Sequence, residues 1–217
     1  MEKQQEWQGY YGYYLSEARR KGVNPLDVLD EQWFDGRTNA QCVLPYICAD
    51  SDVLEIACGI GRISRFIAPH CRGLHCADIL DEALAEARLQ LGEFHNISFD
   101  KINGYDLAVY KSDLFDCVYS FATFFHFDFE LVVRYLAEIK RVLKPGGIAI
   151  IEFKQWKDKR DVLQLLEKIA HQGGLKIYHA ELDKWRYVSK EMLAVLCDFY
   201  DLQVIDQDVT KFTFRKG

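Results

Sequence analysis

Apolar positions recur along the chain in two rhythms, one typical of buried strands and one typical of helices. Five short apolar runs predict strands at residues 52–57, 73–78, 97–102, 115–121 and 148–153. Apolar residues at helical spacing fill segments between these runs, most clearly residues 81–91 and 129–143. Strands that alternate with helices favour a parallel sheet with helices on both faces.

The segments before and after this alternating region follow a different pattern. A helix is predicted at residues 4–21 and a second at about 39–47, both before the first strand. Beyond the fifth strand, the spacing predicts helices at residues 158–172 and 189–200, with an ambiguous stretch at 175–187 between them. The last runs, 202–206 and 209–215, predict a hairpin, so we expect five parallel strands followed by an antiparallel pair.

Composition is that of an ordinary folded protein. The chain has 217 residues, the size of one substantial domain, and 28% of them are charged. The amino terminus is polar and the apolar runs are short, so neither a secretory signal nor a membrane span is expected. Seven cysteines without a CxxC pair do not form a disulfide framework. We therefore expect a soluble, cytoplasmic protein.

The net charge and two histidine–cysteine pairs indicate whether nucleic acid or a metal ion is expected as a partner. The formal net charge is -6, whereas nucleic-acid-binding proteins usually have a basic face, so nucleic acid is not expected as a partner. Short basic clusters at residues 19–21 and 154–160 are interpreted as surface. His70-Cys71 and His75-Cys76 have metal-ligating side chains, but the second pair falls in a predicted buried strand, where cysteine acts as a small apolar residue. No metal is expected, and the sequence leaves the oligomeric state open.

The first predicted strand leads into a glycine-rich turn, Cys58-Gly59-Ile60-Gly61, and a helix is expected from about Arg62. The two glycines allow a tight turn and close approach of a ligand to the backbone. The helix that follows would present unpaired N–H groups to a nucleotide-like ligand. A dinucleotide-binding motif needs a third glycine where this chain has Ser64, so the turn is a poor clamp for the pyrophosphate of NAD.

Two acidic residues accompany the turn. Glu55 lies inside the first strand, where an unpaired carboxylate is unfavourable, so we expect it to orient the turn or to accept from an amine or a cationic group. Asp78 ends the second strand, where a carboxylate can accept hydrogen bonds from both hydroxyls of an adenosine ribose. The alternative role of Asp78 is to cap the helix that starts near Asp81. The turn and the acid together favour a nucleoside-containing ligand.

The stretch LEIACGIGR resembles the first motif of class I S-adenosylmethionine-dependent methyltransferases, E-x-G-x-G-x-G, with Ala57 at the first glycine position. The resemblance continues, in the family's order, in LHCADILDEALAEAR, INGYDL, FDCVYSFATFFHF and EIKRVLKPGGIAIIEF. It implies a three-layer α/β/α sandwich whose mostly parallel seven-stranded sheet has an antiparallel last strand. Residues 1–217 would form a single methyltransferase domain, with a helical lid at 1–48, a cofactor-binding core at 52–153, and the acceptor side and closing strands at 154–217.

The resemblance also implies which residues bind the cofactor, S-adenosylmethionine, and its product S-adenosylhomocysteine. The methionine part would be held by Glu55, Ala57, Gly59 and Gly61. The ribose and adenine would be bound by Asp78, Ile79, Asn103 and Gly104. The end of the fourth strand would line the site near the sulfonium through Ser120 and Phe121.

Methyl transfer from a sulfonium requires alignment of the acceptor, the methyl carbon and the sulfur, with water excluded. His126 follows the fourth strand at the carboxyl edge of the sheet, where ligands bind in open α/β sheets, and histidine titrates near neutrality. We expect it to act as the general base where the acceptor needs one. Its alternative role is packing in an aromatic cluster with Phe124, Phe125 and Phe127.

Acceptor-site residues are expected from both ends of the chain. Tyr11 and Tyr14 would come from the amino-terminal helix, with packing on the core as their alternative role, and Trp185 would come from the region beyond the fifth strand. The chain lacks the Asn-Pro-Pro-Tyr, Asp-Pro-Pro-Tyr and Pro-Cys motifs of DNA-base methyltransferases. The expected acceptor is therefore a small molecule, whose identity and methylated atom stay open.

Two other functions fit the same sequence. A nicotinamide-dependent oxidoreductase can use a similar fold, although Ser64 argues against it. A binding or regulatory protein that kept the cofactor site and lost catalysis would share every motif above, because fold does not fix function.

Overall fold

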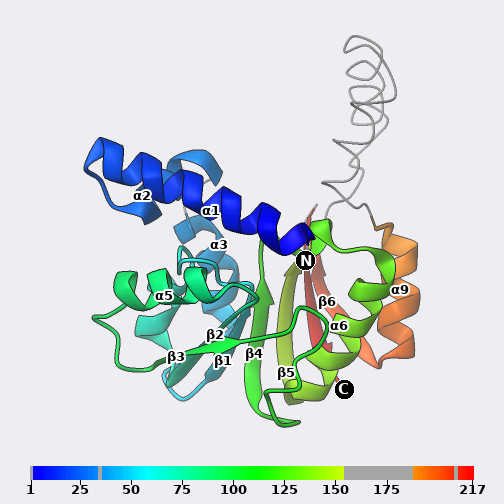
Figure 1. Ribbon diagram of the computed structural model, residues 1–217. Coiled ribbons are helices and arrows are strands. Elements are labelled where there is room, and N and C mark those ends of the chain that lie inside the picture. Colours follow the sequence, from blue (N-terminus) through cyan, green and yellow to red (C-terminus); the bar gives the residue numbers. More distant parts are fainter. Residues whose placement is uncertain (1, 34–35, 154–187, 208–209) are drawn as a thin grey trace, which may run out of the picture.

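The computed structural model describes residues 2–33, 36–153, 188–207 and 210–217. In these residues the strands are β1 (Asp52–Ile56), β2 (Gly73–Asp78), β3 (Ile97–Lys101), β4 (Phe115–Ser120), β5 (Leu143–Glu152), β6 (Leu202–Gln207) and β7 (Lys211–Lys216). They form one seven-stranded sheet in the order β3-β2-β1-β4-β5-β7-β6 (Figure 1). Neighbours from β3 to β5 pair in parallel, whereas β7 is antiparallel to both β5 and β6. The predicted sheet with an antiparallel last strand is confirmed.

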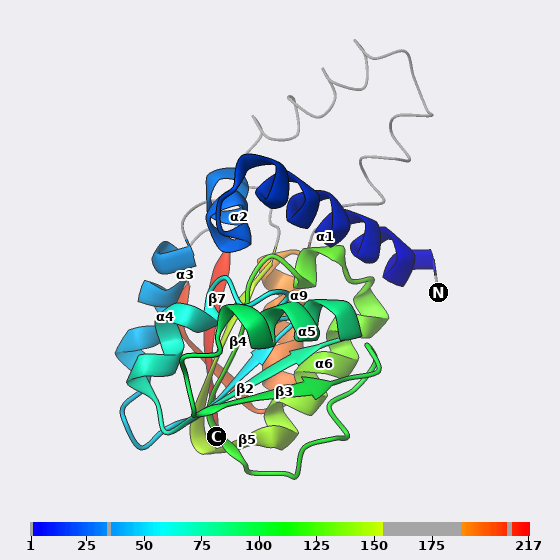
Figure 2. The same ribbon diagram turned by 60° about the vertical axis from the view of Figure 1, so that its left-hand side comes forward.

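The helices lie on both faces of the sheet and across one of its edges. They are α1 (Glu2–Lys21), α2 (Pro25–Trp33), α3 (Gly36–Val43), α4 (Ser64–Ile67), α5 (Asp81–Gln90), α6 (Phe129–Val142) and α9 (Lys190–Phe199), with short 3-10 helices η1 (Leu44–Tyr46), η2 (Ala68–His70) and η3 (Phe124–His126). α6 and α9 lie on one face of the sheet. α1 crosses the edge at which the parallel strands end (Figure 1 and Figure 2).

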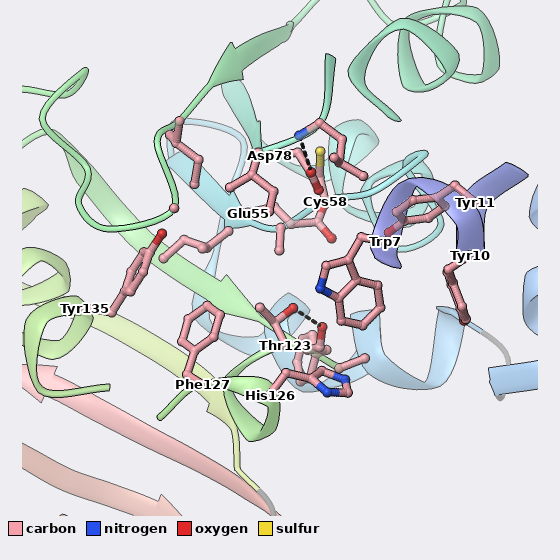
Figure 3. A pocket seen from close by; sticks show the side chains of 18 of the residues that line it. Trp7, Tyr10, Tyr11, Glu55, Cys58, Asp78, Thr123, His126, Phe127 and Tyr135 are labelled. Carbon is pink, nitrogen blue, oxygen red and sulfur yellow. Dashed lines mark hydrogen bonds between the residues drawn. The ribbon is translucent and has the colours of Figure 1, made fainter. Parts of the chain in front are cut away.

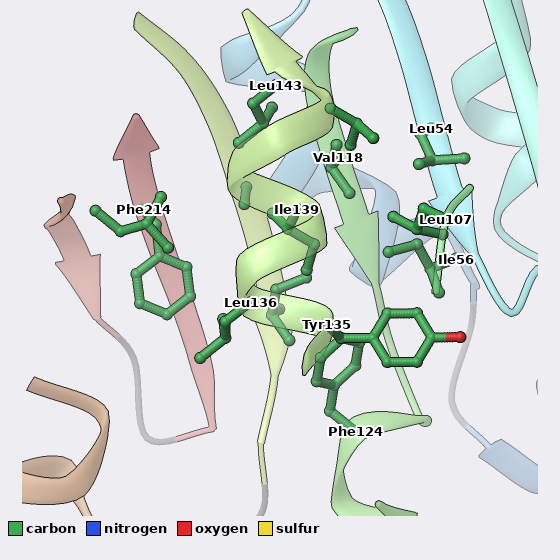
Figure 4. Close-up of a cluster of buried hydrophobic side chains, with 14 of the residues drawn as sticks. Leu54, Ile56, Leu107, Val118, Phe124, Tyr135, Leu136, Ile139, Leu143 and Phe214 are labelled. Atoms are coloured by element: carbon green, nitrogen blue, oxygen red, sulfur yellow. The ribbon is translucent and has the colours of Figure 1, made fainter. Parts of the chain in front are cut away.

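Both faces of the central strands are buried, which explains their continuous apolar runs. In β1, Leu54 and Ile56 belong to the core cluster beneath α6 and α9, whereas Val53 belongs to the cluster beneath α3 and α4. Figure 4 shows the first cluster, in which Leu136 and Ile139 of α6 face the sheet. Successive residues of one strand therefore serve two separate cores.

α6 forms for the reasons that its sequence indicates. The Asp128 side chain caps its start by accepting a hydrogen bond from the Leu131 N–H at 3.1 Å. A stripe at helical spacing is buried against the sheet: Val132, Tyr135, Leu136, Ile139 and Val142. This fixes the position of the loop between β4 and α6, which borders the site.

The pattern did not predict α2. The helix predicted at residues 4–21 ends at Lys21, as α1 does, but Pro25 is the first residue of a further helix, α2. Proline is favoured there because its fixed φ suits a first helical turn and its missing N–H has no helical partner. The Asn24 side chain accepts from the Leu26 N–H at 2.7 Å, and Leu26 is buried under α1.

Two further boundaries differ from the prediction. The helix expected from Arg62 begins at Ser64 and has only 4 residues. Residues 144–147, which separate the predicted helix at 129–143 from the predicted fifth strand, are part of β5. This strand begins at Leu143, with a register irregularity opposite Phe115 and Cys117. Gly146 absorbs this irregularity with φ of 76°. The helix predicted at 158–172 and the stretch 175–187 lie outside the described residues.

Candidate functional site

A cavity of about 680 Å³ lies at the carboxyl edge of the sheet, between α1 and the loops after β1, β2, β3 and β4 (Figure 3). β2 and β4 flank β1 on opposite sides, so the strand order reverses here, as it does at ligand sites of open α/β sheets. The volume falls in the range of small-molecule sites, roughly 300–1,000 Å³. Its walls are apolar and aromatic, with carboxylates of Glu55, Asp78 and Asp128 among them.

The glycines after β1 serve packing rather than direct contact with the cavity. Gly59 has a φ of 56°, and a Cβ atom there would lie 2.3 Å from the Tyr11 hydroxyl oxygen. Gly61 has a φ of 92°, and a Cβ atom would lie 2.6 Å from Leu91. Neither glycine lines the cavity, so the expected direct role in holding the ligand passes to their neighbours.

Ala57 lines the cavity with a φ of 61°, a left-handed conformation that glycine adopts more readily. Ala57 stands at the first glycine position of the family motif, and the backbone conformation here favours that glycine. The turn thus holds an alanine under local backbone strain beside the ligand space.

Glu55 connects the strand, the turn and the following helix. Its Oε2 accepts hydrogen bonds from the Ser64 hydroxyl at 2.5 Å and from the Tyr119 hydroxyl at 2.8 Å. Burial raises the pKa of Glu55 to about 7, against the two hydrogen bonds, which lower it. Ser64, at the position of the third glycine of a dinucleotide motif, is thereby explained as the anchor of α4 on β1.

Asp78 is buried at the end of β2 and faces the cavity. Its Oδ2 accepts from the Gly59 N–H and its Oδ1 from the Leu80 N–H, both at 2.9 Å. Burial raises its pKa, against these hydrogen bonds. Asp78 therefore ties the turn after β1 to the turn before α5. It does not cap α5, its alternative role, because the N-cap position is Leu80 and no side chain caps the helix.

The loop after β3 forms one wall. Gly104 has a φ of 81°, and a Cβ atom there would lie 3.2 Å from Cγ2 of Ile79, which lines the same wall. Asn103 also borders the cavity, but its side chain is engaged in its own turn: it donates to Asp106 at 2.9 Å and accepts from the Tyr105 N–H at 2.8 Å. The contact expected of Asn103 with a ring amine would have to replace these bonds.

The loop after β4 forms the opposite wall. Phe121, Ala122 and Thr123 line the cavity, whereas the Ser120 hydroxyl donates to the Ile56 carbonyl at 2.9 Å and lies outside the lining. Ser120 holds β4 to β1, which is the structural reason for a polar residue at this buried position. Ala122 has a φ of 57°, and its N–H donates to Glu152 at 2.7 Å.

The segment that contains these strands and turns also matches a known family. Residues 54–151 match the model of the methyltransferase domain. This segment of the chain is a methyltransferase domain. Glu55, Asp78, Gly104 and Phe121 all lie in the matched segment of the methyltransferase domain.

Individual proteins are similar to this chain at low sequence identity. Nodulation protein S of Rhizobium tropici is 26% identical over 123 residues, which are 55% of this chain and 50% of that protein, so the chain matches about half of this curated relative's length. The structure of the N-methyltransferase NodS from Bradyrhizobium japonicum WM9, in complex with S-adenosylhomocysteine, is 16% identical, with a TM-score of 0.60 over 83% of this chain and 86% of that one. A SAM-dependent methyltransferase from Methanosarcina mazei is 18% identical, with a TM-score of 0.60 over 81% and 96% of the two chains. The likeness of these structures shows the fold.

The residues proposed for the acceptor side fall into three groups. Tyr11 and His126 line the cavity of the methyltransferase domain. Tyr14 is buried in the cluster between α1 and α2 and does not line it, so its alternative role, packing, describes it. Trp185 lies outside the described residues.

Sequence reasoning did not assign two residues that shape the site. Trp7 stands at the cavity with its ring 4.8 Å from that of His126, in an edge-to-face contact (Figure 3). Trp7 and Tyr11 are four residues apart and so share one helix face, a signal that the sequence does contain. Glu152 accepts from the Ala122 N–H and so orients the loop after β4. No local sequence pattern indicates this contact, because the two residues are 30 positions apart.

The described residues were also compared with two other kinds of functional feature, a membrane-spanning helix and a metal site. No helix among the described residues is long and apolar enough to cross a bilayer. The described part of the chain also holds no group of three or more His, Cys, Asp and Glu side chains arranged for a metal ion. His75, one of the two histidines beside a cysteine, instead meets the Ser98 hydroxyl at 2.8 Å.

Proposed function

We propose that this methyltransferase domain binds S-adenosylmethionine and transfers its methyl group in line to a small-molecule acceptor. The observation that carries this proposal is the form of the cavity. One end has a buried carboxylate beside a glycine-containing turn, and the other has aromatic rings from α1 and from the loop after β4. Such a cavity holds a nucleoside-containing cofactor and a second molecule side by side.

The residues at the first end fit the cofactor. The Asp78 carboxylate accepts from the backbone N–H groups of Gly59, Leu80 and Ile79. It also lines the cavity, where its remaining acceptor capacity can meet the ribose hydroxyls. Ile79 and the Cβ-free surface of Gly104 form an apolar wall for a flat ring. Glu55 adds a titratable carboxylate near a cofactor that carries positive charge.

When bound, the cofactor supplies a methyl group on a positively charged sulfur, which is already activated for transfer. The chain then has to orient the acceptor and exclude water, and this alone can supply roughly 7 kcal/mol or more of rate enhancement. Trp7 and His126 contact each other edge to face at the second end, where their rings limit the access of solvent. In this proposal the His126 imidazole takes the proton that the acceptor releases.

An amine is the acceptor class that we propose. NodS is described as an N-methyltransferase, and it shares the fold of this chain. The aromatic rings of Trp7, Tyr10 and Phe127 at the cavity suit an amine, since aromatic faces attract cationic groups and an amine is protonated before it reacts.

Thermal unfolding with added ligands tests cofactor binding. A ligand at about 100 times its dissociation constant stabilises the folded chain by roughly 2.7 kcal/mol, or roughly 5–10 °C for a domain of this size. We expect this rise with S-adenosylmethionine and S-adenosylhomocysteine and none with NAD. A rise with NAD alone would instead support the oxidoreductase.

The variant Asp78→Ala tests which residue binds the ribose of the cofactor. We expect at least a tenfold weaker affinity for S-adenosylmethionine by calorimetry, because the ribose hydroxyls lose their acceptor. Asp81→Ala is the control, since its carboxylate lies nearby in the first turn of α5 and pairs with Lys101. Equal affinities of the two variants would remove Asp78 from the ribose site.

Turnover then tests the transfer itself. Methyl-labelled S-adenosylmethionine is incubated with a panel of primary and secondary amines, phenols and carboxylic acids, and products are identified by mass spectrometry. Labelled amines support the proposal, and labelled products of another class overturn the choice of acceptor. Cofactor binding without turnover on any acceptor favours the non-catalytic alternative.

A further inference from the structure

Tyr11 reaches from α1 into the turn after β1. Its hydroxyl oxygen occupies the space beside Gly59, where a Cβ atom would come within 2.3 Å of it, and its ring fills the same space at 3.0 and 3.3 Å. Tyr11 also lines the cavity (Figure 3). A residue from the amino-terminal helix thus completes the wall of the turn, at the position that the sequence assigned to the glycine alone.

The surroundings keep this hydroxyl a hydrogen-bond donor. Burial raises the pKa of Tyr11 well above its ordinary value, and the nearby Asp78 and Cys58 raise it further. The phenol is therefore neutral across physiological pH and has a proton to donate. Tyr11 is half-buried and lines the cavity, so a ligand bound there can accept this proton.

Charged groups of both signs gather around the same turn. Arg62 lines the cavity and pairs with Asp30 of α2 at 3.6 Å, and Glu55 lies at the base of the turn. The charge of Arg62 acts on both Tyr11 and Glu55, which places the three side chains in one neighbourhood. A cation, a hydroxyl donor and a carboxylate together complement a zwitterionic amino-acid group.

We propose that Tyr11 is a cofactor-binding residue, whose hydroxyl donates a hydrogen bond to the α-carboxylate at the amino-acid end of S-adenosylmethionine. This moves Tyr11 from the acceptor to the cofactor, and it rests on the proposed function. It also makes α1 part of both sites, because Trp7 lies one turn before Tyr11 on the same helix face and meets His126 at the acceptor end. Binding of the amino-acid end then sets the position of the acceptor wall.

Two ligands that differ only in the amino-acid end give the test. S-adenosylhomocysteine has the α-carboxylate, and 5′-methylthioadenosine has the same nucleoside and thioether without it. Tyr11→Phe keeps the ring beside Gly59 and removes only the hydroxyl. We expect calorimetry to show a roughly tenfold weaker affinity of Tyr11→Phe for S-adenosylhomocysteine and an unchanged affinity for 5′-methylthioadenosine.

The control is Tyr13→Phe, a hydroxyl removed from the exposed side of the same helix, where the residue is 60% exposed. It should bind both ligands as the wild type does, and thermal unfolding without ligand shows that each variant is folded. Unchanged affinity of Tyr11→Phe for S-adenosylhomocysteine, or an equal loss for both ligands, overturns the inference. Failure of the wild type to bind S-adenosylhomocysteine would instead overturn the proposed function.

Discussion

Glu55 is a residue whose ionisation is linked to folding near neutral pH. Buried with the Ser64 and Tyr119 hydroxyls as donors, it has a pKa of about 7 in the folded chain, against 4.5 ordinarily. Between these values the unfolded chain has lost a proton that the folded chain keeps. The contribution of Glu55 to stability is therefore present at low pH and decreases as the pH rises from about 4.5 to 7.

Glu55→Gln should remove this dependence, because the amide is neutral at every pH. The free energy of unfolding of the variant, relative to the wild type, should rise between pH 5 and pH 8 by up to roughly 3 kcal/mol. Urea denaturation at several pH values measures the difference, with Glu130→Gln on the exposed start of α6 as control. A difference that stays constant with pH would show that Glu55 is ionised throughout.

The sequence predicts which residues lie at the cavity where a local feature decides their position. Asp78 and Glu55 stand at the ends of a motif whose geometry is local, and both line the cavity. Ser120 and Gly59 do not line it, because their contacts with Ile56 and Tyr11 come from segments distant in the sequence. Local spacing carries no information about such partners.

At the scale of elements, the acceptor end depends on η3 and α1 meeting across the cavity. His126→Ala should lower kcat by roughly a hundredfold and leave the affinity for S-adenosylhomocysteine within about twofold, since we propose that the imidazole takes the acceptor's proton. Added imidazole should restore part of the turnover, which a purely packing role would not produce. His95→Ala, exposed between α5 and β3, is the control.

Both readouts are needed to separate the roles of His126. If kcat and cofactor affinity both stay at the wild-type level, the residue is structural and the edge-to-face contact with Trp7 is its role. If both fall together, η3 positions the cofactor rather than the acceptor.

Element boundaries show where sequence reasoning ends. α6 was predicted closely because its cap and its buried stripe are local features. α2 was not predicted because a proline can follow the end of one helix or begin the next. Pro25 begins α2, and this helix is stabilised by the packing of α1 over Leu26 and Leu29. The start of β5 was placed too late because pairing with Phe115 extends the strand back to Leu143.

At the scale of the whole molecule, the topology could be predicted because strand–helix alternation permits few arrangements. The sequence pattern could not show that the last strand, β7, completes the hydrophobic core. β7 pairs with β5 from Glu152 to Ile148, and its Phe212 and Phe214 are 2% and 0% exposed in the cluster that supports α6. The segment that matches the methyltransferase family, residues 54–151, does not contain this strand.

A chain ending at Thr210 should therefore lose the fold, although it keeps every residue that we propose to contact the cofactor. Loss of two buried phenylalanines, at roughly 3–5 kcal/mol each, approaches the whole stability of a domain, roughly 5–15 kcal/mol. It would also leave β5 as an apolar edge. We expect no cooperative unfolding transition and no binding of S-adenosylhomocysteine by calorimetry.

Single substitutions distinguish an effect on the stability of the core from an effect on ligand binding. Phe214→Ala should be destabilised by roughly 3–5 kcal/mol yet bind S-adenosylhomocysteine within about twofold of the wild type, because Phe214 does not line the cavity. Val204→Ala on β6, where the residue is 39% exposed, should change stability by only about 0.5 kcal/mol. If the shortened chain unfolds cooperatively and binds the ligand, the family segment folds without the closing strand, and β7 adds stability to a site that is already complete.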